Sequence, residues 1–323
     1  MNRTIFEYHP TIGYKFLPQI KARIPHEAGG YFVVTNSDGF RSDWEYEKKQ
    51  VAGKKRVLVF GDSFTAGDGV SNKYRYTDLL QKMNPDIELY NFGLPGSGTD
   101  QQWLMYQEYG QQYEHDLLVI AVLVENIRRV NSTFRYFMDG SGEQKVWMKP
   151  YFEEENGTLV LKNTPVQPEP IEVSKLSEAD KQKIDTGGRF EPLRKLVNKL
   201  GLKDIVQKVV HFQPVPEYDS PNSKEWLLLK AILESWASQS PVPVLIVPIP
   251  LFHHVEGTAD ASPYQQRFSE IECKGKVFDP LPDLMSYDAT VRRSFRFEKD
   301  VHLTPAGHEA IATSLNKVLK SYL

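Results

Sequence analysis

The sequence of 323 residues predicts an α/β protein, a three-layer α/β/α sandwich around a five-stranded, mainly parallel sheet. Two observations lead to this prediction. Short runs of β-branched and apolar residues alternate with amphipathic helical stretches, which is typical of a parallel sheet wrapped by helices. One of these runs, LLVIAVLV, is apolar throughout, as expected of a strand that is covered on both faces.

Five such runs are expected as the strands of the sheet. In chain order they are residues 56–60, 87–92, 117–123, 242–248 and 276–278. The helices that cover the sheet are expected at residues 76–83, 99–109, 224–239, 263–273 and 305–319. The last of these helices has a clear start, because Thr304 can cap it and Pro305 suits the first helical position.

Two regions are expected outside this core, which comprises residues 54–131 and 224–323. Residues 1–53 are interpreted as a β-rich extension packed on the core, in which GYFVVTNSDGFRS predicts two short strands around a turn at Asp38-Gly39. Residues 132–223 are interpreted as an insertion. It contains a hairpin, PYFEEENGTLVLKN, that turns at Asn156-Gly157, followed by the basic amphipathic stretch LRKLVNKLGLKDIVQKVV. That stretch is expected to pack as a cap over the sheet, with a membrane surface as the alternative.

Composition narrows the class of protein. With 40% hydrophobic and 25% charged residues and a formal net charge of −3, the chain gives no reason to expect a nucleic acid as partner. The single cysteine, Cys273, excludes an internal disulfide framework and suits a reducing compartment. No apolar run approaches the ~18 residues of a membrane span, and the first residues lack the features of a secretory signal. A cytoplasmic location is therefore expected.

Four polar segments follow the predicted strands or precede the last helix. They are GDSFTAG, NFGLPGSGTD, VLVENIRR and KDVHLTPAGHEA. In open α/β sheets, ligands bind at the carboxyl ends of the strands. We therefore expect these four segments to meet at one edge of the sheet.

Together the segments contain the groups that nucleophilic acyl chemistry requires. Ser63 is the candidate nucleophile, and a serine hydroxyl needs a nearby base to remove its proton. His302 is the candidate base, and Asp300, two residues earlier, is the candidate for orienting the imidazole. The oxyanion of a tetrahedral intermediate needs donors, which the Ser63 amide, a glycine amide of residues 93–98 and the side chain of Asn126 can supply. Asp62 is expected to accept hydrogen bonds from backbone amides around the nucleophile turn.

This set resembles the SGNH, or GDSL-type, hydrolase superfamily, whose four blocks contribute a serine, a glycine, an asparagine and a histidine. GDSFTAG and DVHLTPAGH are similar to the first and last blocks. NFGLPG is similar to the second block, and the resemblance implies that its last glycine, Gly96, supplies an oxyanion-hole amide. Asn126 stands in a third block that departs from the usual Gly-x-Asn-Asp. Lys299 occupies the place of the commoner aspartate, whereas spacing like that of Asp300 occurs in branches that resemble polysaccharide O-acetyltransferases.

The resemblance covers the core and implies an esterase. It implies hydrolysis of a short acyl ester, with O-acetyl groups on a carbohydrate as the first expectation, through an acyl-enzyme on Ser63 and without a metal or organic cofactor. Two alternatives remain open: transfer of the acyl group to a glycan hydroxyl, and a binding module that has the fold but no activity. Arg129, with Arg128 and Arg135, is a candidate for binding an anionic group of the substrate.

Three other kinds of site are alternatives to this one. The nucleophile elbow of the α/β-hydrolase fold needs a glycine two residues after the serine, where this chain has Thr65. A dinucleotide-binding loop at NFGLPGSGTD needs an acid about 20 residues after its glycines, and Glu125 lies too far along the chain. A metal site would have to be built from His253, His254, Asp300 and His302.

Overall fold

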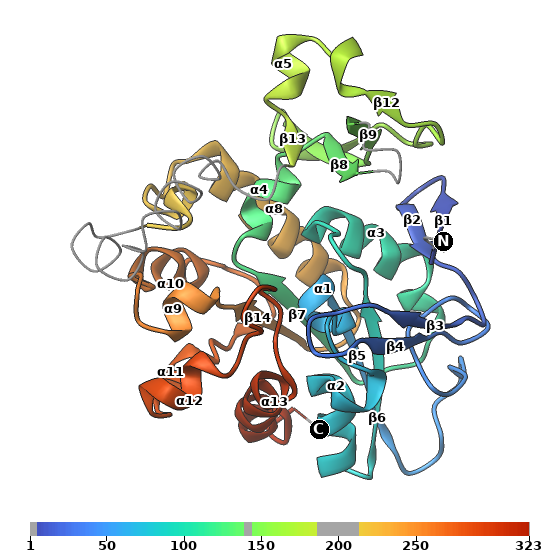
Figure 1. Cartoon of the computed structure of the whole chain (residues 1–323), viewed down its shortest axis with the longest axis vertical. Coiled ribbons are helices and arrows are strands. Elements are labelled where there is room, and N and C mark those ends of the chain that lie inside the picture. Colours follow the sequence, from blue (N-terminus) through green and yellow to red (C-terminus); the bar gives the residue numbers. More distant parts are fainter. Residues whose placement is uncertain (1–4, 139–143, 186–212, 323) are drawn as a thin grey trace.

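The structure is a computed structural model that describes residues 5–138, 144–185 and 213–322. Its centre is a five-stranded sheet in the order β15-β14-β7-β5-β6 (Figure 1). Every neighbouring pair in this sheet is parallel, which confirms the predicted fold class. The strands are β5 (Lys55–Gly61), β6 (Ile87–Gly93), β7 (Leu117–Leu123), β14 (Val244–Ile249) and β15 (Lys276–Val277).

The apolar runs became central strands because both faces of the sheet are covered. All seven residues of β7 are buried, and so are all six of β14. On one face α2 (Tyr76–Met83) packs against α13 (Pro305–Leu319). On the other face α3 (Thr99–Glu108) packs against α8 (Lys224–Gln239). The result is the predicted three-layer sandwich, with the two pairs of helices on opposite sides of the strands (Figure 1).

One predicted helix is shorter than expected. The stretch expected at residues 263–273 forms α10 (Ser262–Ser269), with Glu270 as its C-cap. The amides of Glu270 and Ile271 bond to carbonyls three residues back, so the last turn tightens and the helix stops before the glycine and lysines that follow. Short helices outside the prediction are α1 (Ser63–Ala66), α4 (Asn126–Val130), α5 (Glu178–Lys181), α9 (Phe252–Val255), α11 (Leu281–Met285) and α12 (Ala289–Arg293). Single 3-10 turns are η1 (Asn72–Tyr74), η2 (Gly110–Gln112), η3 (Val173–Lys175) and η4 (Pro216–Tyr218).

The N-terminal extension consists of two antiparallel hairpins. They are formed by β1 (Phe6–His9) with β2 (Gly13–Phe16), and by β3 (Lys21–Ile24) with β4 (Tyr31–Val34). The turn at Asp38-Gly39 is present, with Gly39 at φ +79°. The prediction of a second strand after this turn is wrong, because only an isolated bridge joins Thr35 to Arg41. The side chain of Arg41 is buried and bonds to carbonyls of the core, so the chain turns inward instead of continuing a ladder.

Residues 132–223 contain a second sheet in the order β12-β9-β8-β13. Its strands are β8 (Phe134–Met138), β9 (Gln144–Met148), β12 (Ile171–Glu172) and β13 (Ile184–Asp185). The expected hairpin is formed by β10 (Tyr151–Glu155) and β11 (Thr158–Lys162). Asn156 and Gly157 both have positive φ, +52° and +76°, as a two-residue hairpin turn of this type requires. The amphipathic stretch 193–210 lies outside the described residues.

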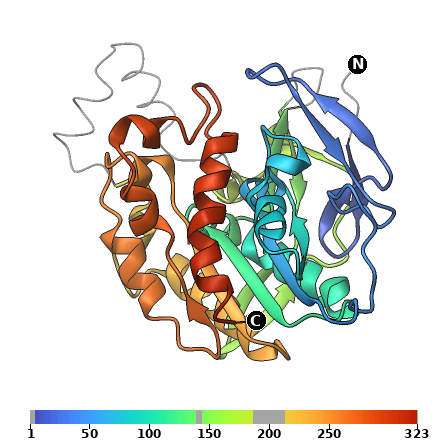
Figure 2. The same cartoon turned by 90° about the horizontal axis from the view of Figure 1, so that it is seen from below.

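The N-terminal extension and the inserted region touch each other beside the core, because Arg135 of β8 bonds to Tyr14 of β2 and the amide of Val166 bonds to the carbonyl of Pro10, at 2.7 Å. The second sheet lies at one end of the molecule, beyond α3 and α4 (Figure 1). The N-terminal strands lie along one flank of the core, and the short helices α9 to α12 lie along the other, with α13 between them (Figure 2). Among the described residues, no helix is both long enough and apolar enough to cross a lipid bilayer.

Candidate active site

Ser63 lies at the carboxyl end of the central strand β5, as the first residue of α1. The turn before it is tight, since a side chain at Gly61 would overlap the hydroxyl of Thr65, with its Cβ only 2.0 Å from that oxygen. Asp62 caps α1 by accepting a hydrogen bond from the amide of Phe64, at 3.0 Å. This is the contact expected of Asp62. Close packing at Gly61 and the cap together fix where the Ser63 hydroxyl lies.

The side chain of His302 reaches Ser63 from the far end of the sequence. Its Nε2 is 2.8 Å from the Oγ of Ser63, and its Nδ1 is 2.6 Å from the Oδ1 of Asp300. A carboxylate only accepts hydrogen bonds, so Nδ1 carries the proton and Nε2 is left to accept from the serine hydroxyl. Asp300 Oδ1 also accepts from the amide of His302, at 3.1 Å. The structure thus brings together the three residues that were predicted to meet.

The segment that carries His302 is held at both ends. Thr304 caps α13 through the amide of Gly307, at 3.3 Å, as the sequence predicted. Just before the cap, Leu303 is bridged to Arg296, and the amide of Phe297 bonds to the carbonyl of His302. The histidine therefore belongs to a short, well-anchored strand-like segment, and the helix does not depend on it for capping.

The charges around His302 favour its protonated form. Burial by itself lowers the pKa of His302, because it disfavours the imidazolium ion. The hydrogen bond to Asp300 and the negative charge of Asp68 oppose this effect by raising the pKa. The negative charge of Asp62 raises it as well, so the pKa of His302 is raised overall. Burial also raises the pKa of Asp300, but its hydrogen bonds to His302 and His26 and the charge of His302 hold that pKa well below its usual range. The pair is therefore set to stabilise an imidazolium when one forms.

Gly96 and Asn126, the two residues expected in an oxyanion hole, lie at the same edge of the sheet as Ser63. Gly96 follows β6 and has φ +72°, in the left-handed region that favours glycine. Asn126 follows β7 as the first residue of α4. Its side chain is 0% exposed, yet neither its Nδ2 nor its Oδ1 has a hydrogen-bond partner among the described residues. A buried amide without a partner is costly, which is typical of a group kept for a ligand.

The three arginines proposed for an anionic group have different surroundings. Arg128 bonds to Glu217 at 2.7 Å, so its charge is neutralised within the fold. Arg129 donates to the Oδ2 of Asp62, at 2.7 Å, and thereby supports the nucleophile turn. The guanidinium of Arg135, from β8 of the second sheet, lies directly over Gly96, where a Cβ would come within 1.5 Å of it. Two of the three therefore flank the candidate site, and a role in substrate binding stays a prediction.

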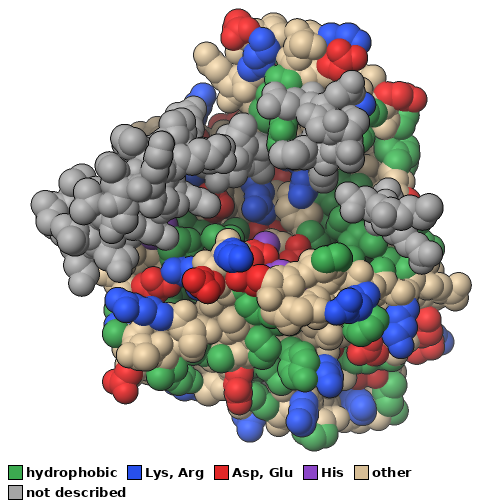
Figure 3. Space-filling model, in the orientation of Figure 1, with side chains coloured by type: hydrophobic (Ala, Val, Ile, Leu, Met, Phe, Trp, Pro, Cys, Tyr) green, Lys and Arg blue, Asp and Glu red, His purple; other side chains and the backbone are tan. Residues whose placement is uncertain are grey.

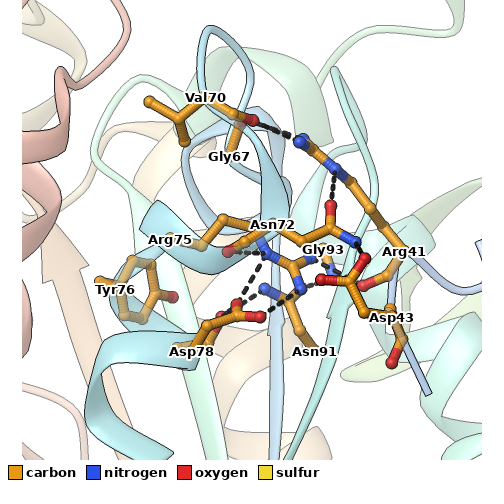
Figure 4. A network of polar contacts seen from close by, with 12 residues as sticks. Arg41, Asp43, Gly67, Val70, Asn72, Arg75, Tyr76, Asp78, Asn91 and Gly93 are labelled. Carbon is orange, nitrogen blue, oxygen red and sulfur yellow. Dashed lines mark hydrogen bonds and ion pairs between the residues drawn. The ribbon is translucent and has the colours of Figure 1, made fainter. Parts of the chain in front are cut away.

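The loop that follows Ser63 is supported from inside by Arg41. This guanidinium donates to the carbonyls of Ala66 and Gly67, at 2.7 and 2.8 Å, and to Val70. Figure 4 shows Arg41 beside Arg75, whose own guanidinium donates to the carbonyl of Arg41, at 2.7 Å, and to Asp78. The network is buried and links the N-terminal extension to the segment that carries the candidate nucleophile.

Sequence reasoning missed three residues around His302. Asp68 lies in the loop after α1, with its amide bonded to the carbonyl of Ser63 at 3.0 Å, and its charge acts on His302. His26 and Glu27, from the turn between β3 and β4, contact Asp300 and its backbone. GDSFTAGD does place Asp68 close to Ser63 in sequence. Nothing near His26 indicates a partner so distant along the chain.

The alternative metal site receives no support from this geometry. His253 and His254 lie on α9, where His253 bonds to Thr258 and His254 is buried against Tyr264. Within residues 5–138, 144–185 and 213–322, no three potential metal ligands are grouped closely enough to hold an ion.

A hollow marks the face of the molecule that is shown in Figure 3. Histidine and acidic side chains lie along its edge, and Lys or Arg side chains lie inside it, between the core and the second sheet. The surface there is therefore strongly polar on at least two sides.

No protein family model matches the chain, and no curated protein matches it in sequence. Solved structures with a similar arrangement include a lipolytic protein of the G-D-S-L family from Veillonella parvula, at 13% identity and a TM-score of 0.42, covering 82% of this chain and 98% of that one. Another is a lipase/acylhydrolase from Enterococcus faecalis, at 12% identity and a TM-score of 0.42, covering 83% and 96%. A third is a two-domain esterase active on acetylated mannans, at 12% identity and a TM-score of 0.39, covering 84% of this chain and 50% of that one. At such identities and TM-scores the likeness carries no argument about function, which has to be inferred from the site.

Proposed function

We propose that this protein is a serine hydrolase that cleaves carboxylic esters through an acyl-enzyme on Ser63. The observation that carries the proposal is the continuous set of hydrogen bonds from Ser63 Oγ to His302 Nε2, at 2.8 Å, and from His302 Nδ1 to Asp300 Oδ1, at 2.6 Å. A hydroxyl within reach of an oriented base is what nucleophilic catalysis by serine requires.

The first half of the reaction forms the acyl-enzyme. Ser63 Oγ attacks the ester carbonyl carbon while its proton passes to His302 Nε2, and Asp300 stays ionised and stabilises the imidazolium. When the tetrahedral intermediate collapses, the bond to the alcohol oxygen breaks and the alcohol leaves with the proton from His302. In the second half, water gives a proton to His302 and its oxygen attacks the acyl group. The carboxylic acid then departs and Ser63 regains its proton.

The negative oxygen of each tetrahedral intermediate needs donors that are already in place. We assign this role to the amides of Ser63 and Gly96 and to the side-chain amide of Asn126. The support comes from the position of Ser63 at the start of α1, where a first-turn amide has no partner within the helix, and from the unpartnered, buried side chain of Asn126.

We propose a short acyl ester of a polar alcohol as the substrate, with O-acetyl groups on a carbohydrate as the first candidate. The charged side chains close to Ser63, which include Asp68, Asp300 and Arg129, favour a hydrated alcohol over a long acyl chain, because burying such charges against hydrocarbon is costly. Arg129 and Arg135 border the Gly96 loop and are the proposed contacts for an anionic substituent of that alcohol.

Turnover of p-nitrophenyl acetate by purified variants tests the serine mechanism. Ser63→Ala should lower kcat/KM by about 10³-fold or more, because removing one member of such a group disables the whole. The matched control is Ser238→Ala, which removes an exposed hydroxyl on α8 and should leave the rate unchanged. Equal rates for wild type and Ser63→Ala would contradict the mechanism.

The acceptor of the acyl group is a separate question, because a glycan hydroxyl can replace water in the second half of the reaction. Adding an oligosaccharide acceptor and following products by mass spectrometry separates the two. Acetylated oligosaccharide would identify an acyltransferase, and free acetate alone would identify a hydrolase. A wild-type protein that releases no p-nitrophenol and is not labelled by a fluorophosphonate would instead be a binding module without activity.

A further inference from the structure

Asp300 has a second histidine as partner. The Oδ2 of Asp300, the oxygen that does not face His302, lies 3.1 Å from the Nε2 of His26. The two residues are 274 positions apart in the chain. The side chain of His26 is 9% exposed and that of Asp300 is 31% exposed, so the contact is partly sheltered from solvent.

The surroundings of His26 decide which of its nitrogens carries the proton. The amide of Ala28 donates to Nδ1, at 3.3 Å, so Nδ1 is an acceptor and the hydrogen of the neutral ring is on Nε2. That hydrogen points at Asp300. The ring is held in this orientation by edge contacts with Phe297 and Tyr31, at centroid distances of 4.4 and 5.9 Å.

The next residue, Glu27, holds the backbone of the same segment. Its carboxylate accepts from the amide of Lys299, at 3.0 and 3.1 Å, and from the amide of Asp300, at 2.8 Å. Hydrogen bonds to an ionised acceptor are stronger than those between neutral groups. One turn of the N-terminal extension therefore forms hydrogen bonds with both parts of Asp300: His26 bonds to its side chain and Glu27 bonds to its backbone amide.

Both carboxylate oxygens of Asp300 therefore have hydrogen-bond donors. Oδ1 accepts from the amide and the Nδ1 of His302, and Oδ2 accepts from His26. A carboxylate on a short side chain rotates readily about its last bond, and such a rotation would weaken the hydrogen bond that orients the imidazole. A donor on Oδ2 opposes the rotation.

We propose that His26 is a positioning residue of the active site, which acts through Asp300 and extends the set Ser63, His302 and Asp300 by a fourth member. The inference rests on the proposed function. It assigns a catalytic purpose to the N-terminal extension, whose second hairpin closes onto the segment before α13 and completes the site.

The test compares two substitutions of His26 in the full chain, with p-nitrophenyl acetate as substrate. His26→Leu keeps a side chain of similar size but has no donor, and should lower kcat by about tenfold or more while KM changes by less than about twofold. The reason is that Asp300 matters most when the imidazolium forms. His26→Gln provides an amide N–H of similar reach and should restore kcat to within about threefold of wild type.

Two controls separate a positioning role from a merely structural one. His115→Leu alters a half-buried histidine just before β7, at the opposite edge of the sheet, and should leave kcat unchanged. Melting temperatures from circular dichroism show whether a loss of kcat follows a loss of stability. Equal kcat values for His26→Gln and His26→Leu would overturn the proposal. A loss of kcat that scales with melting temperature, or that His115→Leu shares, would overturn it as well.

The Ser63→Ala variant in the same series distinguishes the two failures. If Ser63→Ala abolishes turnover but His26→Leu matches wild type, only the role of His26 is refuted. If Ser63→Ala matches wild type, the proposed function itself fails, and the inference about His26 fails with it.

Discussion

Removing the side chain of Asn126 should separate activity from stability. The amide is fully buried, and neither of its polar atoms has a partner in the described part of the chain. If Asn126 serves the oxyanion, Asn126→Ala removes one of three donors. Loss of a single such donor costs about 10²- to 10³-fold in kcat, which is roughly 3–4 kcal/mol of transition-state stabilisation.

In contrast to the loss of activity, the free energy of unfolding should change little or should increase. Leaving a buried polar atom unpaired costs about 1–3 kcal/mol, and the variant removes two such atoms. Against this stands the cavity that truncation leaves, which costs about 1 kcal/mol for a side chain of this size. We therefore expect the free energy of unfolding of Asn126→Ala to equal or exceed that of wild type, as is common where a site is kept at the expense of stability.

Two measurements on the same protein check this reasoning. Steady-state hydrolysis of p-nitrophenyl acetate gives kcat and KM, and urea unfolding followed by circular dichroism gives the free energy of unfolding. An Asn126→Ala variant that loses more than about 2 kcal/mol of stability while keeping wild-type kcat would refute it. In that case the asparagine would be a packing residue of α4.

The remaining predictions concern His302 with its partner Asp300, and the buried side chain of Arg41. The rate kcat/KM should fall on the acid side with a midpoint above 6.5, the ordinary pKa of histidine, because His302 acts as a base only when neutral and its pKa is raised. In Asp300→Asn the midpoint should move to lower pH, since the hydrogen bond and charge that raise the pKa of His302 are lost. The kcat should fall on the order of 10³- to 10⁴-fold. A pH profile of both proteins checks this, and an unshifted midpoint would contradict it. Arg41→Met should lower the free energy of unfolding in urea by about 3–5 kcal/mol, because the buried carbonyls of residues 66, 67 and 70 lose their donor. Its control, Arg293→Ala, changes an exposed residue of α12 and should stay within about 0.5 kcal/mol of wild type.

The sheet could be predicted from the sequence because its signal is local. β7 and β14 are apolar along their whole length, and each is followed by turn residues, so strand and edge are both visible in a short window. The meeting of Ser63 and His302 could be expected because parallel strands present their carboxyl ends at one edge, and the segment before the last helix was assigned to the same edge. The catalytic roles of these residues stay predictions until they are tested.

What the sequence did not reveal depends on side chains that act over long distances. Arg41 ends the expected second strand of its hairpin because its guanidinium satisfies carbonyls of the loop after α1, and tertiary contacts of this kind override local strand propensity. His26 has no local feature that points to Asp300. The second sheet was missed because two of its strands, β12 and β13, have only two residues each, too few for a periodic pattern to show.

Labelling with a fluorophosphonate probe tests the central claim most directly, since the probe reacts with a serine only when a neighbouring base activates it. Peptide mapping of the wild-type protein should locate a single adduct, on Ser63, and Ser63→Ala should take up none. His302→Ala should be labelled more slowly by about 10²-fold or more. Labelling of Ser63→Ala at the wild-type rate, or no labelling of the wild type, would contradict the account.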